Sequence, residues 1–253
     1  MAEKNTENKF PSEVIDLPSQ GKLYPKEHPC SDGKLELKYM TAKEEDILTS
    51  ENLIKKGVAL DKALNAMIVT KGVSCDDLIM GDKNAVMVAA RILAYGPEYS
   101  CDIMHPATKE IEKYTFNLAD CPFKKLPKGV TTNDFKFELP VSKTKISFKI
   151  LTSAEERLVD RDIQASKKVG LKIDNTLTTR YMHIITSVDG DDSRETINSL
   201  AQNMLARDSL ALRKEMARIT PSIEMKQDID MGGGEVVSVD IPMTTEFFWP
   251  TSL

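Results

Sequence analysis

The pattern of apolar and polar residues predicts short strands and helices along the chain. The stretches 34–40 (KLELKYM) and 144–151 (TKISFKIL) carry apolar residues at alternate positions, as in a half-buried strand. Later segments carry apolar residues three and four positions apart, which predicts helices that each bury one face. These segments are 60–69, 83–96, 193–205 and 209–219. Short strands mixed with helices indicate the α+β class.

Pairs of extended runs close each half of the chain. EYSCDIM and EIEKYTFNL flank HPATK in the first half, and SIEMKQDI and EVVSVDIP flank DMGGG in the second. Gly232, Gly233 and Gly234 permit the positive φ angles that a tight hairpin turn often requires. A phosphate-binding loop would continue with Gly-Lys-Ser/Thr and a helix, whereas Glu235 and a strand follow here. Both regions are therefore predicted to be β-hairpins.

The same landmarks occur twice in the same order, which predicts a tandem duplication. LELKYMTAKEEDIL aligns with ISFKILTSAEERLV, and four of the matched positions are identical: Lys38 with Lys149, Thr41 with Thr152, Glu44 with Glu155, and Glu45 with Glu156. Each copy is expected to contain a short strand, several helices and a closing hairpin. The predicted units are an extended N-terminal segment (1–29), a first α+β repeat (30–128) and a second α+β repeat with an aromatic C-terminus (129–253).

The matched threonines and glutamates fit a helix start. In Thr41-x-x-Glu44 and Thr152-x-x-Glu155 the threonine side chain can cap the helix while the glutamate returns to the threonine amide. Such a cap is worth about 1 kcal/mol. These residues are therefore interpreted as structural helix caps. A catalytic carboxylate cluster with Asp46 is disfavoured, because the second copy has Arg157 at that position.

Residue types that carry catalysis or bind metals are scattered. No histidine pair has the spacing of a helical metal site, and no cysteines form a C-x-x-C pair. These residues are His28, His105, His183, Cys30, Cys75, Cys101 and Cys121. We therefore expect structural cysteines, a non-enzymatic protein, and no catalytic residue, metal or cofactor. A small hydrolase or transferase built on Cys75, His183 and a carboxylate is the alternative.

Composition narrows the classes of partner. The chain has 253 residues, enough for one large or two ordinary domains, and 41% hydrophobic with 29% charged residues is typical of a folded protein. A net charge of −5 disfavours nucleic acid, whose binders carry a basic stripe. The chain lacks an apolar run of about 20 residues and an N-terminal signal core, so neither a membrane span nor export is expected.

The C-terminus carries three contiguous aromatic residues, Phe247, Phe248 and Trp249. Aromatics this near a chain end either dock on their own domain or contact a partner. Docking is favoured, because the first copy has Phe123 and Pro127 in the matching stretch. The aromatics are also the candidate partner contacts.

Four stretches together resemble a known family: LPSQGKLYP (17–25), MTAKEEDIL (40–48), YGPEY (95–99) and FFWP (247–250). The chain resembles the baseplate hub proteins of T-even-like contractile-tailed bacteriophages, a family that includes the hub subunit and the hub assembly catalyst. The resemblance implies a structural or chaperone-like protein made in the host cytoplasm, as a component of the virion baseplate or as a transient assembly factor. Implied partners are other hub proteins and the tape-measure protein.

The resemblance does not extend to a metal site. Some relatives carry paired cysteines in the hairpins, whereas this chain has only Cys101 and Cys121 near its first hairpin and none in its second. An intracellular adaptor unrelated to phage is the remaining alternative, and neighbouring genes for tail proteins would distinguish it from a hub protein.

Overall fold

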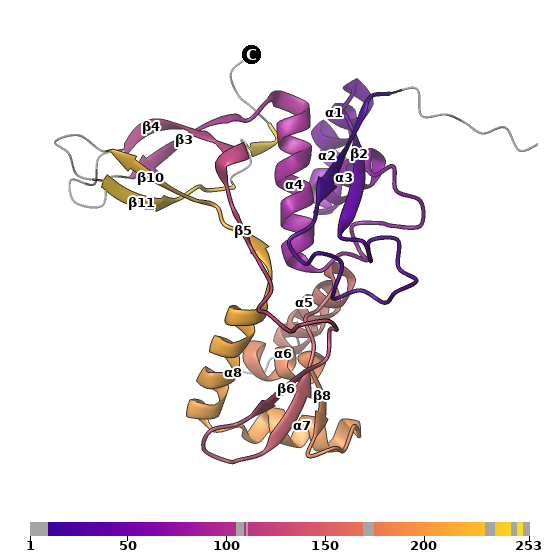
Figure 1. Cartoon of the computed structure of the whole chain (residues 1–253), viewed down its shortest axis with the longest axis vertical. Helices are drawn as coiled ribbons and strands as arrows, with labels where there is room; N and C mark the ends of the chain where they lie inside the picture. Colours follow the sequence, from indigo (N-terminus) through magenta and orange to yellow (C-terminus); the bar gives the residue numbers. More distant parts are fainter. Residues whose placement is uncertain are drawn as a thin grey trace, which may run out of the picture.

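The computed structural model describes residues 10–104, 109, 111–168, 175–230, 236–243 and 247–249. Figure 1 shows two lobes joined by a narrow link. The first lobe contains β1 (Ser12–Asp16), β2 (Lys34–Lys38), α1 (Ala42–Thr49), α2 (Glu51–Lys55), α3 (Ala59–Met67), α4 (Met80–Tyr95), β3 (Glu98–Met104), β4 (Ile111–Asn117), the 3-10 helix η1 (Leu118–Asp120), β10 (Lys226–Asp230) and β11 (Val236–Asp240). The second lobe contains β6 (Phe135–Glu138), β7 (Lys145–Phe148), α5 (Ser153–Lys168), α6 (Thr176–Ile184), β8 (Ile185–Val188), α7 (Arg194–Asn203) and α8 (Ala206–Ile219). The link is formed by β5 (Phe123–Lys124) and β9 (Ser222–Ile223).

The predicted α+β class is confirmed by these helices and small antiparallel sheets. The four predicted helices correspond to α3, α4, α7 and α8, and the alternating stretches contain β2 and β7. The hairpins β3–β4 and β10–β11 are also present. The predicted turn glycines Gly232, Gly233 and Gly234 lie outside the described residues.

Strands β1 and β6 were not predicted. Each pairs antiparallel with the strand that opens its copy: β1 pairs with β2, and β6 pairs with β7. The segment 1–29, expected to be simply extended, thus contributes β1 to a sheet. For β6 a signal was available, because Phe135 and Phe137 alternate with charged residues.

The two lobes build their sheets in the same way. After α3, the first lobe returns to β2, where Ile68 pairs with Leu37 and the Val69 amide donates to the Glu36 carbonyl (2.9 Å). The second lobe returns to β7 through β8, where the Lys149 amide donates to the Ile184 carbonyl (3.0 Å). These matched pairings support the duplication, which stays a prediction.

The apolar residues gather in two cores. The second core takes its buried side chains from Leu23, from Ile79 and from residues 135–219. The first core takes its own from residues 17–121 and also from Ile241, Phe247 and Phe248 at the end of the chain. Residues of β10 and β11 pack against this first core, and Figure 1 shows their hairpin beside β3–β4. The segment 129–253 therefore supplies helices to the second lobe and its hairpin to the first.

The link fixes how the chain crosses between the lobes. The chain leaves the first lobe through β5 and returns to it through β9, and these two strands pair antiparallel. Gly81 of α4 lies directly against Pro221, the residue before β9, since a Cβ there would lie 1.9 Å from the Pro221 carbonyl oxygen. Only glycine permits this close approach. Along the described part of the chain, no helix has the length and apolarity needed to span a membrane.

Candidate functional site

The start of α1 is a compact polar cluster. The Glu44 carboxylate accepts hydrogen bonds from the Thr41 amide (2.9 Å) and hydroxyl (2.6 Å), and it pairs with Lys38 Nζ (2.8 Å) at the end of β2. Burial alone would raise the pKa of Glu44, but the hydrogen bonds from Lys38 and Thr41 outweigh it and lower that pKa. Glu44 is thus held ionised where the strand turns into the helix.

The start of α5 has the same arrangement. The Thr152 amide donates to Glu155 (3.0 Å), and the Glu155 amide donates to the Thr152 hydroxyl (3.3 Å). Lys149, at the end of the strand, pairs with the same carboxylate. Burial opposes ionisation here too, and the hydrogen bonds from Lys149 and Thr152 lower the pKa of Glu155. All four predicted cap residues thus lie at helix starts, and the matched lysines join them.

A second matched pair was missed in the sequence. Asp82 in the first turn of α4 is buried and accepts from the Ser19 amide (2.9 Å), the Ser19 hydroxyl (2.5 Å) and the Tyr24 hydroxyl (2.7 Å). Asp208 in the first turn of α8 is also buried and accepts from the amides of Val141 (2.7 Å) and Ser142 (3.0 Å). Each aspartate therefore anchors the loop between the first two strands of its lobe.

The pKa values of the two buried aspartates shift in opposite directions. Burial raises the pKa of Asp82, although hydrogen bonds from Ser19 and Tyr24 oppose the rise. At Asp208 burial also acts to raise the pKa, but hydrogen bonds from Val141 and Ser142 prevail and lower it. The signal for both was present in the matched stretches 81–92 and 207–219, which each carry an aspartate at the second position.

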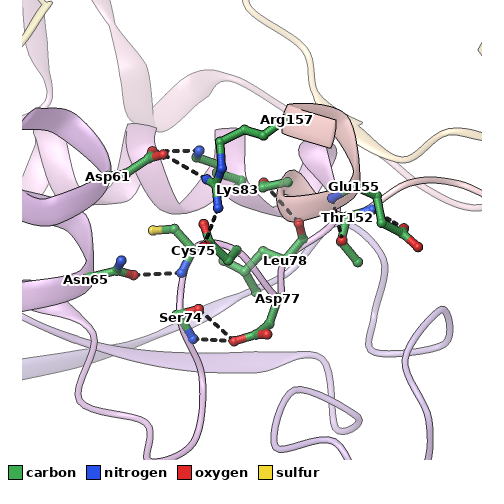
Figure 2. Close-up of polar contacts among 12 residues, drawn as sticks. Asp61, Asn65, Ser74, Cys75, Asp77, Leu78, Lys83, Thr152, Glu155 and Arg157 are labelled. Atoms are coloured by element: carbon green, nitrogen blue, oxygen red, sulfur yellow. Dashed lines mark hydrogen bonds and ion pairs between the residues drawn. The ribbon is translucent and has the colours of Figure 1, made fainter. Parts of the chain in front are cut away.

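Arg157, at which the two predicted copies differ in charge, makes a contact between the lobes. Arg157, which stands where the first copy has Asp46, extends from α5 to the first lobe (Figure 2). It pairs with Asp61 of α3 (3.2 Å) and with Asp76, and Lys83 of α4 pairs with the same Asp61 (2.6 Å). In the predicted second copy, the position that matches Asp46 thus makes a contact between the lobes.

The N-terminus of α5 completes the junction. The Ser153 amide donates to the Leu78 carbonyl (2.8 Å), and the Ala154 amide donates to the Asp76 carbonyl (3.0 Å). The Ser153 hydroxyl also donates to Leu78 (3.1 Å), as Figure 2 illustrates beside Thr152 and Glu155. The first amides of a helix have no partner within the helix. Carbonyls of the first lobe bind these amides and so fix the position of α5.

The C-terminal aromatics dock on the chain itself. Phe247 and Phe248 are 1% and 3% exposed, and the Phe247 ring lies edge-on to Tyr99 of β3 with centroids 5.1 Å apart. The half-buried Trp249 donates from Nε1 to the Leu48 carbonyl (3.0 Å) at the end of α1. Phe247 and Phe248 are therefore covered in this structure, and the core that receives them belongs to the first lobe.

The residues of the alternative hydrolase lie in different lobes. Cys75 is buried in the first core, and burial raises the pKa of its thiol to about 12. His183 of α6 pairs with Asp162 of α5 in the second lobe (3.0 Å). A nucleophilic cysteine needs a thiolate close to its base. This geometry gives the hydrolase no support.

The remaining candidate ligands are dispersed. His28 stacks on Tyr24 with ring centroids 4.6 Å apart, and His105 lies outside the described residues. All four cysteines are buried and not in disulfides. Within the ranges that the structure describes, no group of three or more metal-binding side chains could hold an ion.

The comparisons with known proteins found no relative of this chain. No protein-family model, no curated protein and no solved structure matches the chain.

Proposed function

We propose that this chain is a non-enzymatic structural or assembly protein of the tail baseplate hub of a contractile-tailed bacteriophage. Its partners would be other hub proteins and the tape-measure protein, first in the host cytoplasm and then at the baseplate. One observation carries the proposal: each of the four stretches that resemble the hub family lies at a joint of this fold.

The first stretch, LPSQGKLYP, anchors a loop to α4. Ser19 and Tyr24 both donate to the buried Asp82, and Leu17 is 1% exposed in the first core. Gly21 has a φ of +74°, and a Cβ there would lie 2.3 Å from the Ser31 carbonyl oxygen. The glycine is thus required by the turn. The second stretch, MTAKEEDIL, is the capped start of α1.

The other two stretches meet in space. In YGPEY, the Arg91 guanidinium binds the carbonyls of Gly96 (3.0 Å) and Glu98 (3.3 Å), which turns the chain from α4 into β3. The Tyr99 hydroxyl then donates to the Pro242 carbonyl (3.0 Å), and Phe247 of FFWP packs edge-on against the same tyrosine. A resemblance confined to such joints supports a shared fold, and the role follows only by analogy with the family.

Affinity purification tests the proposal. The tagged protein would be captured from infected cells and from uninfected cells that express it, and its partners would be identified by mass spectrometry. We expect tail and hub components to be enriched from the infected cells alone. Host proteins captured equally from both cultures, without any tail component, would favour the adaptor and contradict the proposal.

A further inference from the structure

Strand β1 has one unpaired edge. The Pro11 carbonyl accepts from the Tyr39 amide (3.0 Å), and the Leu17 amide donates to the Gly33 carbonyl (2.8 Å), so odd-numbered residues of this strand face β2. Antiparallel strands alternate the direction of their backbone groups. The amides and carbonyls of Ser12, Val14 and Asp16 therefore face away from β2, and within the described residues no strand pairs with them.

Strand β5 presents a second backbone position that no strand of the described chain pairs with. The Glu224 amide of the returning segment donates to the Pro122 carbonyl (2.8 Å), next to the cross-strand pair Phe123 and Ile223. By the same alternation, the backbone groups of Phe123 face away from β9. Asp16 of β1 and Phe123 of β5 line the same cavities, so these two strands border one groove.

The groove is apolar along its floor. Its first part is a cavity of about 270 Å³ in which Ala85, Val88, Ala89 and Ile92 of α4 lie between β1 and β5. η1 and β9 cover part of this helix face, but Ala89 and Ile92 remain half-exposed. The groove continues as a second cavity of about 350 Å³ along the loop after β1.

The far end of the groove is acidic on one side. Asp16 and Asp32 are exposed there and have no ion pair among the described residues, and Lys125 lies on the β5 side. A basic side chain on an incoming segment would complement the aspartates. The groove therefore combines backbone donors and acceptors, an apolar floor and a local negative charge.

The second lobe provides an internal comparison. Six, seven and ten positions after its buried aspartate, α4 carries Val88, Ala89 and Ile92, whereas α8 carries Lys214, Glu215 and Arg218 at the same distances from Asp208. In α8, the exposed Arg218 pairs with the half-buried Glu215 (2.7 Å). The equivalent face in the first lobe is apolar, which is the composition needed to bury a ligand's side chains.

We infer that this groove binds an extended segment of a partner protein, which adds as a strand to the outer edge of β1. The segment would carry small aliphatic side chains at alternate positions over Ala89 and Ile92 and a lysine or arginine beside Asp16 and Asp32. Strand addition of this kind obtains affinity from backbone hydrogen bonds and specificity from the alternate side chains. The inference does not depend on the phage assignment.

A displayed library of random dodecapeptides provides the probe. Peptides selected on the full-length protein would be measured against Val14→Pro, which removes an outward amide while the bonds of β1 to β2 stay in place. Val14→Thr is the matched control, because it keeps the amide. Ala89→Leu fills the floor of the groove, and Ala165→Leu on the exposed side of α5 is its control.

We expect selected peptides with alternating aliphatic residues and a basic residue. They should bind Val14→Pro and Ala89→Leu at least about tenfold more weakly, which corresponds to about 1.4 kcal/mol. Val14→Pro removes a backbone donor, and Ala89→Leu occupies the space that the side chains of the peptide would fill. The two controls should bind the peptides normally. Hydrogen exchange should show new protection at Ser12, Val14 and Asp16. Circular dichroism and the thermal midpoint would establish that each variant is folded.

Asp16→Lys gives an independent test on the surface of the protein. This substitution should weaken the binding of peptides that carry a basic residue. Binding should be restored when that residue of the peptide is changed to glutamate. The inference is overturned if selection yields no peptide that binds the folded protein. It is equally overturned if the peptides bind Val14→Pro and Ala89→Leu as tightly as the original protein, or if protection appears on β6 instead of β1.

Discussion

At the scale of single residues, the structure rests on polar contacts that occur in both lobes. Glu44 and Glu155 are each held by a lysine from the preceding strand and by the threonine that starts the helix. The cap residues were predictable, because their spacing is local and its geometry is known. The contacts of the lysines and the burial of Asp82 were not predictable, because they depend on how a strand or loop folds back onto a helix.

The glutamate clusters predict a pH dependence of stability. Both carboxyl pKa values lie below their ordinary value in the folded protein, so their contribution is present above the unfolded pKa and is lost as the pH falls through the folded pKa. Replacing Glu44 and Glu155 by glutamine should lower the free energy of unfolding by roughly 1–3 kcal/mol for each charged hydrogen-bond cluster at neutral pH.

Urea unfolding at neutral pH and below pH 4 measures this effect. The original protein should lose more stability on acidification than the doubly substituted protein. Glu51→Gln is the matched control, since its side chain is 84% exposed in a surface pair with Lys55. Equal losses for all three proteins would contradict the prediction.

The buried Asp82 predicts a large effect of one side chain. Asp82→Ala would leave the buried Ser19 amide and hydroxyl and the Tyr24 hydroxyl without their acceptor, although the Tyr24 oxygen would still accept from the Ile79 amide. Each unsatisfied buried group costs roughly 1–3 kcal/mol, so the urea midpoint should fall clearly. Asp77→Ala is the control, because its carboxylate accepts two hydrogen bonds from Ser74 in an exposed turn. Similar losses in both variants would contradict this account of Asp82.

At the scale of elements, hydrophobic periodicity predicted most helices and both hairpins. The helices carry apolar residues on one face, and β3 alternates buried and exposed residues along its full length. Periodicity does not say which core an element joins. The hairpin β10–β11 and the aromatics after it pack on the first lobe, a contact over long sequence distance that no local pattern records.

The aromatic C-terminus should stabilise the first lobe. Phe247→Ala removes a fully buried ring that contacts Tyr99 and Phe248, which should cost about 3–5 kcal/mol. Met243→Ala is the control, because Met243 is 42% exposed in the same segment. Chemical unfolding followed by circular dichroism compares the two variants. A similar small loss for both would show that Phe247 is not a core residue.

At the scale of the whole molecule, a polar junction joins the lobes, beside the apolar contacts of Leu23 and Ile79 with the second core. Arg157 pairs with Asp61 and Asp76, and the first amides of α5 bind carbonyls of the first lobe. The repeat in the sequence pointed to Arg157 only as a mismatch. The contact of Arg157 with the first lobe could be recognised only from the spatial position of α3, which the sequence does not show.

The junction should set the orientation of the lobes more than the stability of the chain. Arg157 is 47% exposed, and exposed pairs contribute about 0–1 kcal/mol. Arg157→Ala should therefore change the urea midpoint little. It should broaden the distance distribution between spin labels placed at Lys55 and Arg213. Arg161→Ala, which removes a more exposed arginine of the same helix, should leave that distribution unchanged.

The central claim is that the first lobe is built from both ends of the chain. Hydrogen exchange of the full chain and of a chain ending at residue 221 tests it most directly. We expect faster exchange in α4 and β3, which lose the contacts of β9 and Phe247, and unchanged exchange in α7 and α8. Unchanged protection in α4 and β3, or loss confined to the second lobe, would contradict the claim.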